Sequence, residues 1–203
     1  MATEIVKVKG NWQEVVDDCR STVNKPPLGH EPSESFKKSI LIAEHSPIRD
    51  ITIKWRWPCI KSWIATHFSR HKWECFIRTQ RSDRTGINRD ELPQGAEVEF
   101  TGEANVQALI DTMRKRLCYQ AAPETRQYAE SLRDEIRKID PDIASVLVPN
   151  CIYRCGCPER KSCGEWMRFA IWVNSQHIDI TVLASSIQNR YDLYQRYITE
   201  RMQ

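Results

Sequence analysis

One short run of residues alternates strictly between apolar and polar side chains, and it constrains the fold more than any other feature. In residues 51–57, ITIKWRW, Ile and Trp alternate with Thr, Lys and Arg. This period of two predicts a strand that buries one face. Pro58 follows directly and is expected to end the strand. A sheet must therefore form part of the fold.

Most of the remaining chain has the apolar spacing of helices. Residues 96–101 and 166–173 are further candidate strands, and residues 149–164 form a Cys-rich loop. Interspersed helices with a few strands are typical of an α+β fold. We expect helices over residues 12–23, 33–43, 59–72, 105–116, 123–139 and much of 177–201.

Composition excludes several classes of protein. No apolar run approaches the roughly 20 residues that a membrane-spanning helix needs. The first residues lack the apolar region of a signal peptide, and eight cysteines are too few for a disulfide scaffold. We therefore expect a cytoplasmic protein with reduced thiols and no membrane partner. The net charge of +3 is too small to imply a general nucleic-acid binder.

The positive charge is concentrated in one segment. Residues 61–89 contain seven Lys and Arg residues against Glu74 and Asp83, which gives this segment a net charge of +5. Guanidinium groups match the oxygens of a phosphate, so the cluster indicates a phosphorylated ligand, although a solvated basic face has the same pattern. Arg126 lies near the start of a predicted helix, where a cation is disfavoured. A bound anion or a neighbouring carboxylate, such as that of Glu130, would resolve this conflict.

Four ordered blocks of the sequence resemble the flavin-dependent thymidylate synthases, the ThyX family. The family signature reads Arg-His-Arg, then Asn-Glu-x-Ser-x-Arg-Tyr after a spacer; here the two parts are Arg70-His71-Lys72 and residues 79–85, TQRSDRT. An upstream segment, EHSPIRD at 44–50, also resembles the family. The family's downstream pattern is matched, without a gap, by Arg89, Leu92-Pro93, Asn105, Lys115-Arg116 and Arg126.

The resemblance implies both an architecture and a reaction. The expected fold has helices packed around a small, mainly antiparallel sheet, with a catalytic core over residues 1–139 and an extension over 140–203. The implied reaction is the reductive methylation of dUMP to dTMP, with methylenetetrahydrofolate as the methylene donor, FAD as the cofactor and NADPH as the reductant. The family acts as a homotetramer with sites between subunits, so we expect the same assembly here.

The resemblance also assigns roles to individual residues. Ser82 and Arg126 are the expected catalytic residues, with Ser82 as a positioning group and not a nucleophile. The nucleotide-binding residues implied by the family are Gln80, Ser82, Arg84, Arg89 and Arg126. The flavin-binding residues implied by the family are Ser46, Arg70, His71, Lys72 and Asn105. Gln80 stands where the family has Glu, which leaves open another pyrimidine nucleotide as substrate.

The Cys-rich loop is a second candidate site. Four thiolates in a loop of this kind could hold a structural zinc ion, but their spacing differs from the usual pair of hooks, so free or paired thiols are favoured. The loop, the basic segment and the nearby aromatic residues also allow a different reading as a nucleic-acid-binding module. The cysteines are Cys151, Cys155, Cys157 and Cys163, and the aromatic residues are Trp55, Trp57, Trp63, Phe68 and Trp73.

Overall fold

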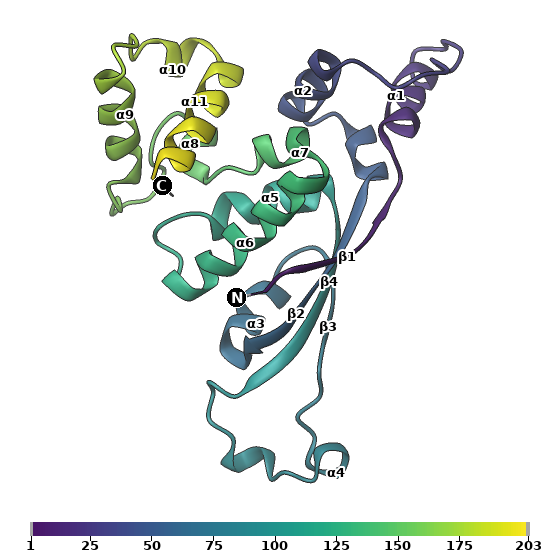
Figure 1. The fold of residues 1–203 in the computed structure, drawn as a ribbon, viewed down its shortest axis with the longest axis vertical. Coiled ribbons are helices and arrows are strands. Elements are labelled where there is room, and N and C mark those ends of the chain that lie inside the picture. The colour runs from purple at the N-terminus through teal and green to yellow at the C-terminus, as the bar shows by residue number, and fades with distance from the viewer. Residues whose placement is uncertain (1, 202–203) are drawn as a thin grey trace.

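A computed structural model describes residues 2–201 and shows helices arranged around one small sheet (Figure 1). The sheet has the strand order β1-β2-β4-β3, and each neighbouring pair is antiparallel. The strands are β1 (Glu4–Lys9), β2 (Thr52–Lys61), β3 (Glu74–Ile77) and β4 (Glu97–Asn105). The predicted α+β fold with a mainly antiparallel sheet is therefore confirmed.

Strand β2 buries the apolar face that its sequence predicts but does not end at Pro58. Trp55 and Trp57 are fully buried and lie opposite Gly102 and Phe100 of β4. The register shifts between Trp57 and Ile60, so the strand continues through a bulge. Residues in a bulge need no ladder hydrogen bond, which is why a proline is tolerated there. The prediction that Pro58 ends the strand was wrong for this reason.

The two helices between β1 and β2 begin directly after the capping residues seen in the sequence. Helix α1 (Trp12–Ser21) is capped by Asn11, and α2 (Glu34–Ala43) by Ser33, whose hydroxyl accepts a hydrogen bond from the Phe36 amide. The short helix η1 (Ser46–Asp50) leads into β2, and α3 (Ser62–Ser69) follows it. Helix α3 is shorter than the predicted 59–72 because β2 extends into its first residues.

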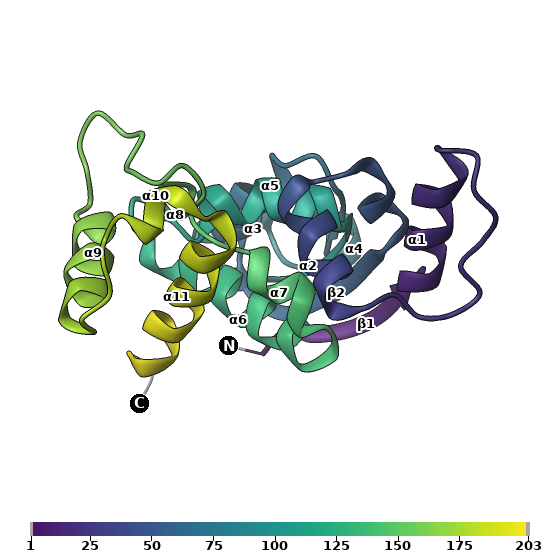
Figure 2. The same ribbon diagram turned by 90° about the horizontal axis from the view of Figure 1, so that it is seen from above.

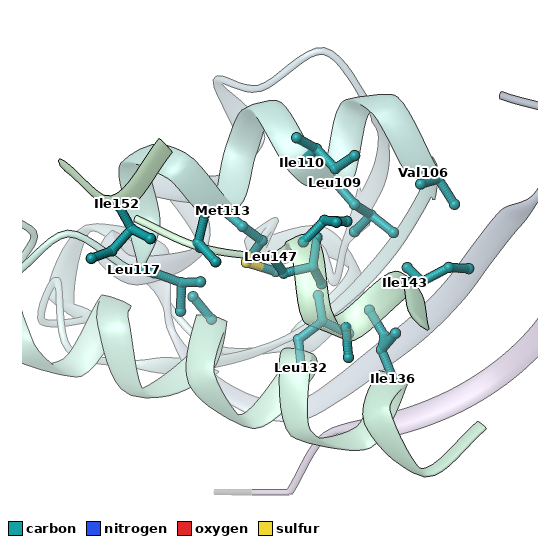
Figure 3. Packing of buried hydrophobic residues seen from close by; sticks show 14 of the residues in the cluster. Val106, Leu109, Ile110, Met113, Leu117, Leu132, Ile136, Ile143, Leu147 and Ile152 are labelled. Atoms are coloured by element: carbon teal, nitrogen blue, oxygen red, sulfur yellow. The ribbon is translucent and has the colours of Figure 1, made fainter. Parts of the chain in front are cut away.

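Helices α5 (Val106–Arg116) and α6 (Pro123–Ile139) form the centre of the core. Figure 3 shows Leu109 and Met113 of α5 on one side of the cluster and Leu132 and Ile136 of α6 on the other, with Leu147 between them. The four side chains of α5 and α6 are fully buried. The spacing of four residues puts each pair on one helix face, as the sequence predicts.

After α6 the described residues form helices joined by loops: α7 (Pro141–Val146), α8 (Asn150–Tyr153), α9 (Glu165–Ser175), α10 (Val182–Ser185) and α11 (Ile187–Glu200). The predicted strand at 166–173 was wrong: Phe169, Ala170 and Val173 are buried with helical spacing on α9. Buried Arg190 holds this part together, donating to the carbonyl oxygens of Ile152 (2.6 Å), Tyr153 (2.9 Å) and Leu183. Helices α9 to α11 lie at the opposite end of the molecule from α1 (Figure 2).

The C-terminal part packs directly on the preceding residues. The guanidinium of Arg114 on α5 lies 3.5 Å from the ring centre of Tyr153 on α8 and forms an ion pair with Glu44. Buried apolar residues from both parts belong to one continuous cluster. The division into a catalytic core over residues 1–139 and an extension over 140–203 stays a prediction, because this packing does not test it. Within residues 2–201 no helix has the length and apolar character needed to span a bilayer.

A long loop projects away from the body of the protein. It joins β3 to β4 and contains α4 (Ser82–Thr85) and the short helix η2 (Arg89–Glu91). Figure 1 shows it beyond the end of the sheet, away from the other helices. Every residue from 81 to 91 is exposed, so this segment has no core of its own.

Candidate active site

The predicted flavin-binding block follows the end of α3. Ile64 and Phe68 anchor this helix in the core, and Arg70 is its C-terminal cap. The side chain of Arg70 is exposed and forms no ion pair with any of residues 2–201. A cation at a helix C-terminus also suits the helix dipole, so capping alone accounts for part of this arrangement.

His71 is held by Arg116 from the end of α5. The Nε of Arg116 donates to Nε2 of His71 at 2.7 Å, and its second nitrogen donates to the carbonyl oxygen of His67 at 2.6 Å. Burial, and then the charge of Arg116, lowers the pKa of His71 to about 4. The imidazole is therefore neutral near pH 7 and accepts a hydrogen bond instead of adding charge.

Lys72 and Asn105 line one cavity of about 340 Å³, together with Trp73 and Thr52. The side-chain oxygen of Asn105 accepts a hydrogen bond from the Ala108 amide and thereby caps α5. The structure thus brings together two predicted flavin-binding residues that lie far apart in the sequence.

Ser46 lies elsewhere. It lines a different cavity, of about 280 Å³, with Cys19 and Phe36 among its neighbours. Of the five predicted flavin-binding residues, Ser46 alone comes from this cavity between α1, α2 and η1.

Four predicted nucleotide-binding residues lie on the projecting loop. The Oγ of Ser82 accepts a hydrogen bond from the Arg89 amide at 3.1 Å, which links two of these residues within the loop. Arg84 lies 3.7 Å from Asp83, and its side chain is 70% exposed. Gln80 precedes this turn and is partly buried. The loop therefore presents polar and cationic groups to the outside of the chain.

Arg126 lies apart from the loop, in the first turn of α6. Its Nε is 3.2 Å from Oε1 of Glu130, and its guanidinium lies 4.0 Å from the ring centre of Tyr119. The carboxylate of Glu130 and the ring of Tyr119 both stabilise the Arg126 cation near the start of the helix. A neighbouring carboxylate was one of the two explanations offered by the sequence. Arg126 lines a cavity of about 610 Å³ that also contains Arg133 and Arg201. None of residues 80–89 lines this cavity, so one chain does not assemble the whole predicted nucleotide site.

Three of the five aromatic residues noted in the sequence do not form a surface on which nucleic-acid bases could stack. Trp55, Trp57 and Phe68 are fully buried. Their rings pack against one another and against Phe100 inside the core, with Trp57 and Phe68 at 4.7 Å between centres. Bases can stack only on exposed rings, so these three residues are unavailable for the nucleic-acid-binding alternative.

The four cysteines that line one cavity in the structure are not the same four that the sequence grouped in the Cys-rich loop. Cys151, Cys157 and Cys163 line a cavity of about 280 Å³ together with Cys118, which the sequence analysis missed. Cys155 is absent from this lining, and its thiol donates to the carbonyl oxygen of Leu183 at 3.3 Å. Only proximity in space reveals Cys118, because it follows α5 and lies far from the Cys-rich loop in the sequence.

Two thiols of the cysteine cavity, those of Cys118 and Cys151, are held in the protonated form by burial. Burial raises the pKa of Cys151 to about 12 and also raises that of Cys118, with neighbouring cysteines adding to both effects. Across residues 2–201 no three His, Cys, Asp or Glu side chains are arranged to hold a metal ion. The zinc alternative therefore gains no support from the geometry.

Comparison with known proteins gives a partial family match and a similar fold. A sequence model of the family described as thymidylate synthase complementing protein matches residues 86–142. No curated protein matches the chain. The matched segment contains β4, α5 and α6 and is similar to the ThyX family.

Two solved structures of a UMP/dUMP methylase, PolB from Streptomyces cacaoi, have a similar fold. The structure bound with 5-Br dUMP is 14% identical with a TM-score of 0.59, and the match covers 71% of this chain and 93% of PolB. The structure bound with 5-Br UMP is 13% identical with a TM-score of 0.56, covering 71% and 92%. The resemblance to the ThyX family predicted from the sequence is thus confirmed, as is a ThyX-like fold.

Proposed function

We propose that this protein is a thymidylate synthase-like enzyme that methylates dUMP to dTMP by a flavin-dependent, reductive route. Methylenetetrahydrofolate would donate the carbon and NADPH would reduce the flavin. The observation that carries the proposal is the family match over residues 86–142, which contain Arg89, Asn105 and Arg126 at the family spacing. The fold shared with a UMP/dUMP methylase supports it. A cytoplasmic location, expected from the sequence, is compatible with this proposed reaction.

The donor set after α3 fits a flavin dinucleotide. The pyrophosphate of such a cofactor needs cations, and Arg70 and Lys72 are exposed cations with no ion-pair partner among residues 2–201. When bound, the flavin supplies the hydride chemistry. The protein's part is to bind and orient: Asn105 shares a cavity with Lys72, and neutral His71 fixes Arg116 beside them.

The nucleotide site is proposed to form between copies of the chain. The loop presents Gln80, Ser82, Arg84 and Arg89, while Arg126 lies in a cavity that the same chain's loop does not reach. A projecting loop can complete that cavity on a neighbouring copy. Arg84 and Arg89 would then hold the phosphate, with Gln80 and Ser82 positioning the base. Arg126 would polarise the uracil carbonyl.

A reconstitution experiment tests the reaction. The purified protein is incubated with FAD, NADPH, methylenetetrahydrofolate and dUMP, and dTMP is measured by mass spectrometry, with each component omitted in turn. We expect dTMP only in the complete mixture, and a change in the visible flavin spectrum when dUMP is added. Production of dTMP without flavin, or a protein that binds neither FAD nor dUMP, would refute the proposal.

The proposed shared site predicts a homotetramer. Light scattering coupled to size-exclusion chromatography measures the mass directly. We expect four copies of the 23.8 kDa chain. A strictly monomeric protein that still binds nucleotide would show that the loop and Arg126 do not meet across subunits.

UMP is a second candidate substrate. Similar structures of PolB, a UMP/dUMP methylase, were determined with both 5-Br UMP and 5-Br dUMP. Gln80 also replaces the family's Glu at a nucleotide-binding position. Competition between equimolar UMP and dUMP, read out as methylated product of each, distinguishes the two candidates.

A further inference from the structure

The cysteine cavity is a site that the proposed nucleotide chemistry does not use. Cys118 comes from the segment after α5, Cys151 from α8, and Cys157 and Cys163 from the loop before α9. These four side chains line one cavity of about 280 Å³. All four are free thiols in the structure. Four cysteines from three separate segments meeting at one cavity form the ligand set of a thiolate-bound metal centre.

The arrangement of the potential ligands distinguishes between a single metal ion and a metal cluster. A single zinc ion draws its four sulfur atoms to about 2.3 Å from one point. No three potential ligands in residues 2–201 are arranged around one ion, although four cysteines line the cavity. A polynuclear iron–sulfur cluster does not need four sulfur atoms to meet at one ion, because its own iron and sulfide atoms lie between the cysteine ligands.

The charges around the cavity also match such a cluster. Four thiolates and their sulfides carry net negative charge, which nearby cations stabilise. Arg114, Lys115 and Arg116 line the cavity, against one acidic residue, Glu159. Arg114 is already paired with Glu44, and Arg116 donates to His71 and to the carbonyl oxygen of His67, but the partners of Arg116 are neutral. The positive charges of Lys115 and Arg116 therefore remain to balance the cluster.

We propose that Cys118, Cys151, Cys157 and Cys163 bind an iron–sulfur cluster. The cluster joins the end of α5 to the C-terminal extension and fixes the loop between α8 and α9. It lies beside the predicted flavin block, because Arg116 lines the cavity and also donates to His71. The site stands on the cysteine geometry and is independent of the proposed dUMP chemistry.

The test begins with the wild-type chain, purified without oxygen and, in parallel, reconstituted with ferrous iron and sulfide. Iron and acid-labile sulfide are measured per chain. We expect two or four iron atoms with an equal amount of sulfide, and broad visible absorption that dithionite bleaches. Neither analysis responds to flavin, so the result is separable from the test of FAD binding. One zinc ion per chain, disulfides among the four cysteines, or no iron after reconstitution would overturn the proposal.

Variants then identify the ligands. Cys157→Ala is compared with Cys155→Ala, which removes a thiol from the same loop but outside the cavity. We expect the first to lose most of its iron and sulfide and the second to keep the wild-type amounts. Cys118→Ala is expected to lose the cluster as well, which tests the contribution of α5. Circular dichroism of each variant reports folding, and the wild-type stoichiometry decides the proposal even where a variant does not fold. Equal iron in the Cys155 and Cys157 variants would refute the assigned ligands.

Discussion

Replacing Arg126 by Ala separates a ligand-binding role from a structural one. In the folded chain Arg126 has an ion pair with Glu130 at 3.2 Å and a cation–π contact with Tyr119 at 4.0 Å. A helical pair spaced by four residues contributes about 0.3–0.5 kcal/mol, and an exposed cation–π contact about 0.5–1 kcal/mol. Arg126→Ala should therefore lower the free energy of unfolding by about 0.8–1.5 kcal/mol.

The expected loss of nucleotide affinity is larger. A charge-assisted hydrogen bond to a nucleotide contributes about 1.5–3 kcal/mol. Its loss weakens dUMP binding about 10- to 150-fold. The melting temperature should fall by only about 2–6 °C, given the size of the chain. Isothermal titration calorimetry with dUMP and differential scanning calorimetry measure the two effects separately.

Glu130→Gln is the matched control. It breaks the same ion pair but leaves the Arg126 guanidinium in place over Tyr119. We expect a small loss of stability, about 0.3–0.5 kcal/mol, and unchanged affinity for dUMP. If Arg126→Ala lowered the melting temperature without weakening dUMP binding, Arg126 would be a structural residue. The assignment of the α6 cavity to the nucleotide would then be wrong.

Three further predictions follow from local contacts. The double variant Arg70→Ala/His71→Ala should purify as a folded but colourless oligomer, whereas FAD retention equal to wild type, read from visible absorption, would contradict the flavin assignment. Burial lowers the pKa of His71 from 6.5 to about 4 in the folded state. As the pH falls, the unfolded state therefore binds a proton at His71 at a higher pH than the folded state does. The free energy of unfolding should then fall as pH decreases from about 6.5 to about 4. His71→Gln should flatten this slope in urea titrations, and an unchanged slope would argue against a buried neutral imidazole. In Gly102→Ala the new Cβ would lie 2.3 Å from a Trp55 ring carbon, so we expect a loss of about 1–3 kcal/mol in thermal unfolding. Gly95→Ala, which has open space around it, is the control, and equal stability of the two variants would contradict this packing.

The sequence determined those elements whose apolar pattern is local and strong. Helix α6 runs over Pro123–Ile139 as predicted, because proline at its start and its buried stripe are both visible in the sequence. The alternating face of β2 was equally clear. Strands β1 and β3 were missed because they lie at the edges of the sheet, where burial leaves little pattern: Val6, Val8 and Phe76 are all exposed.

The aromatic residues of α9 misled the sequence analysis for a related reason. Trp and Phe are enriched in strands, so the segment 166–173 was predicted as one. In the structure Phe169 and Val173 face the core from a helix, against Tyr194 and Tyr197 of α11. Packing against α11 decided between two patterns that a short apolar run cannot distinguish.

The candidate sites divide along the same line. Sequence motifs alone identified the blocks at 70–72 and 79–89 and the family to which they are similar, because these residues are contiguous. Only the tertiary structure showed that Asn105 and Lys72 line the same cavity and that Arg126 lies apart from the loop. It also showed that Cys118, and not Cys155, lines the cysteine cavity. Such groupings depend on how α5, α6 and α8 pack together, and the spacing of residues along one chain does not encode that packing in any local pattern.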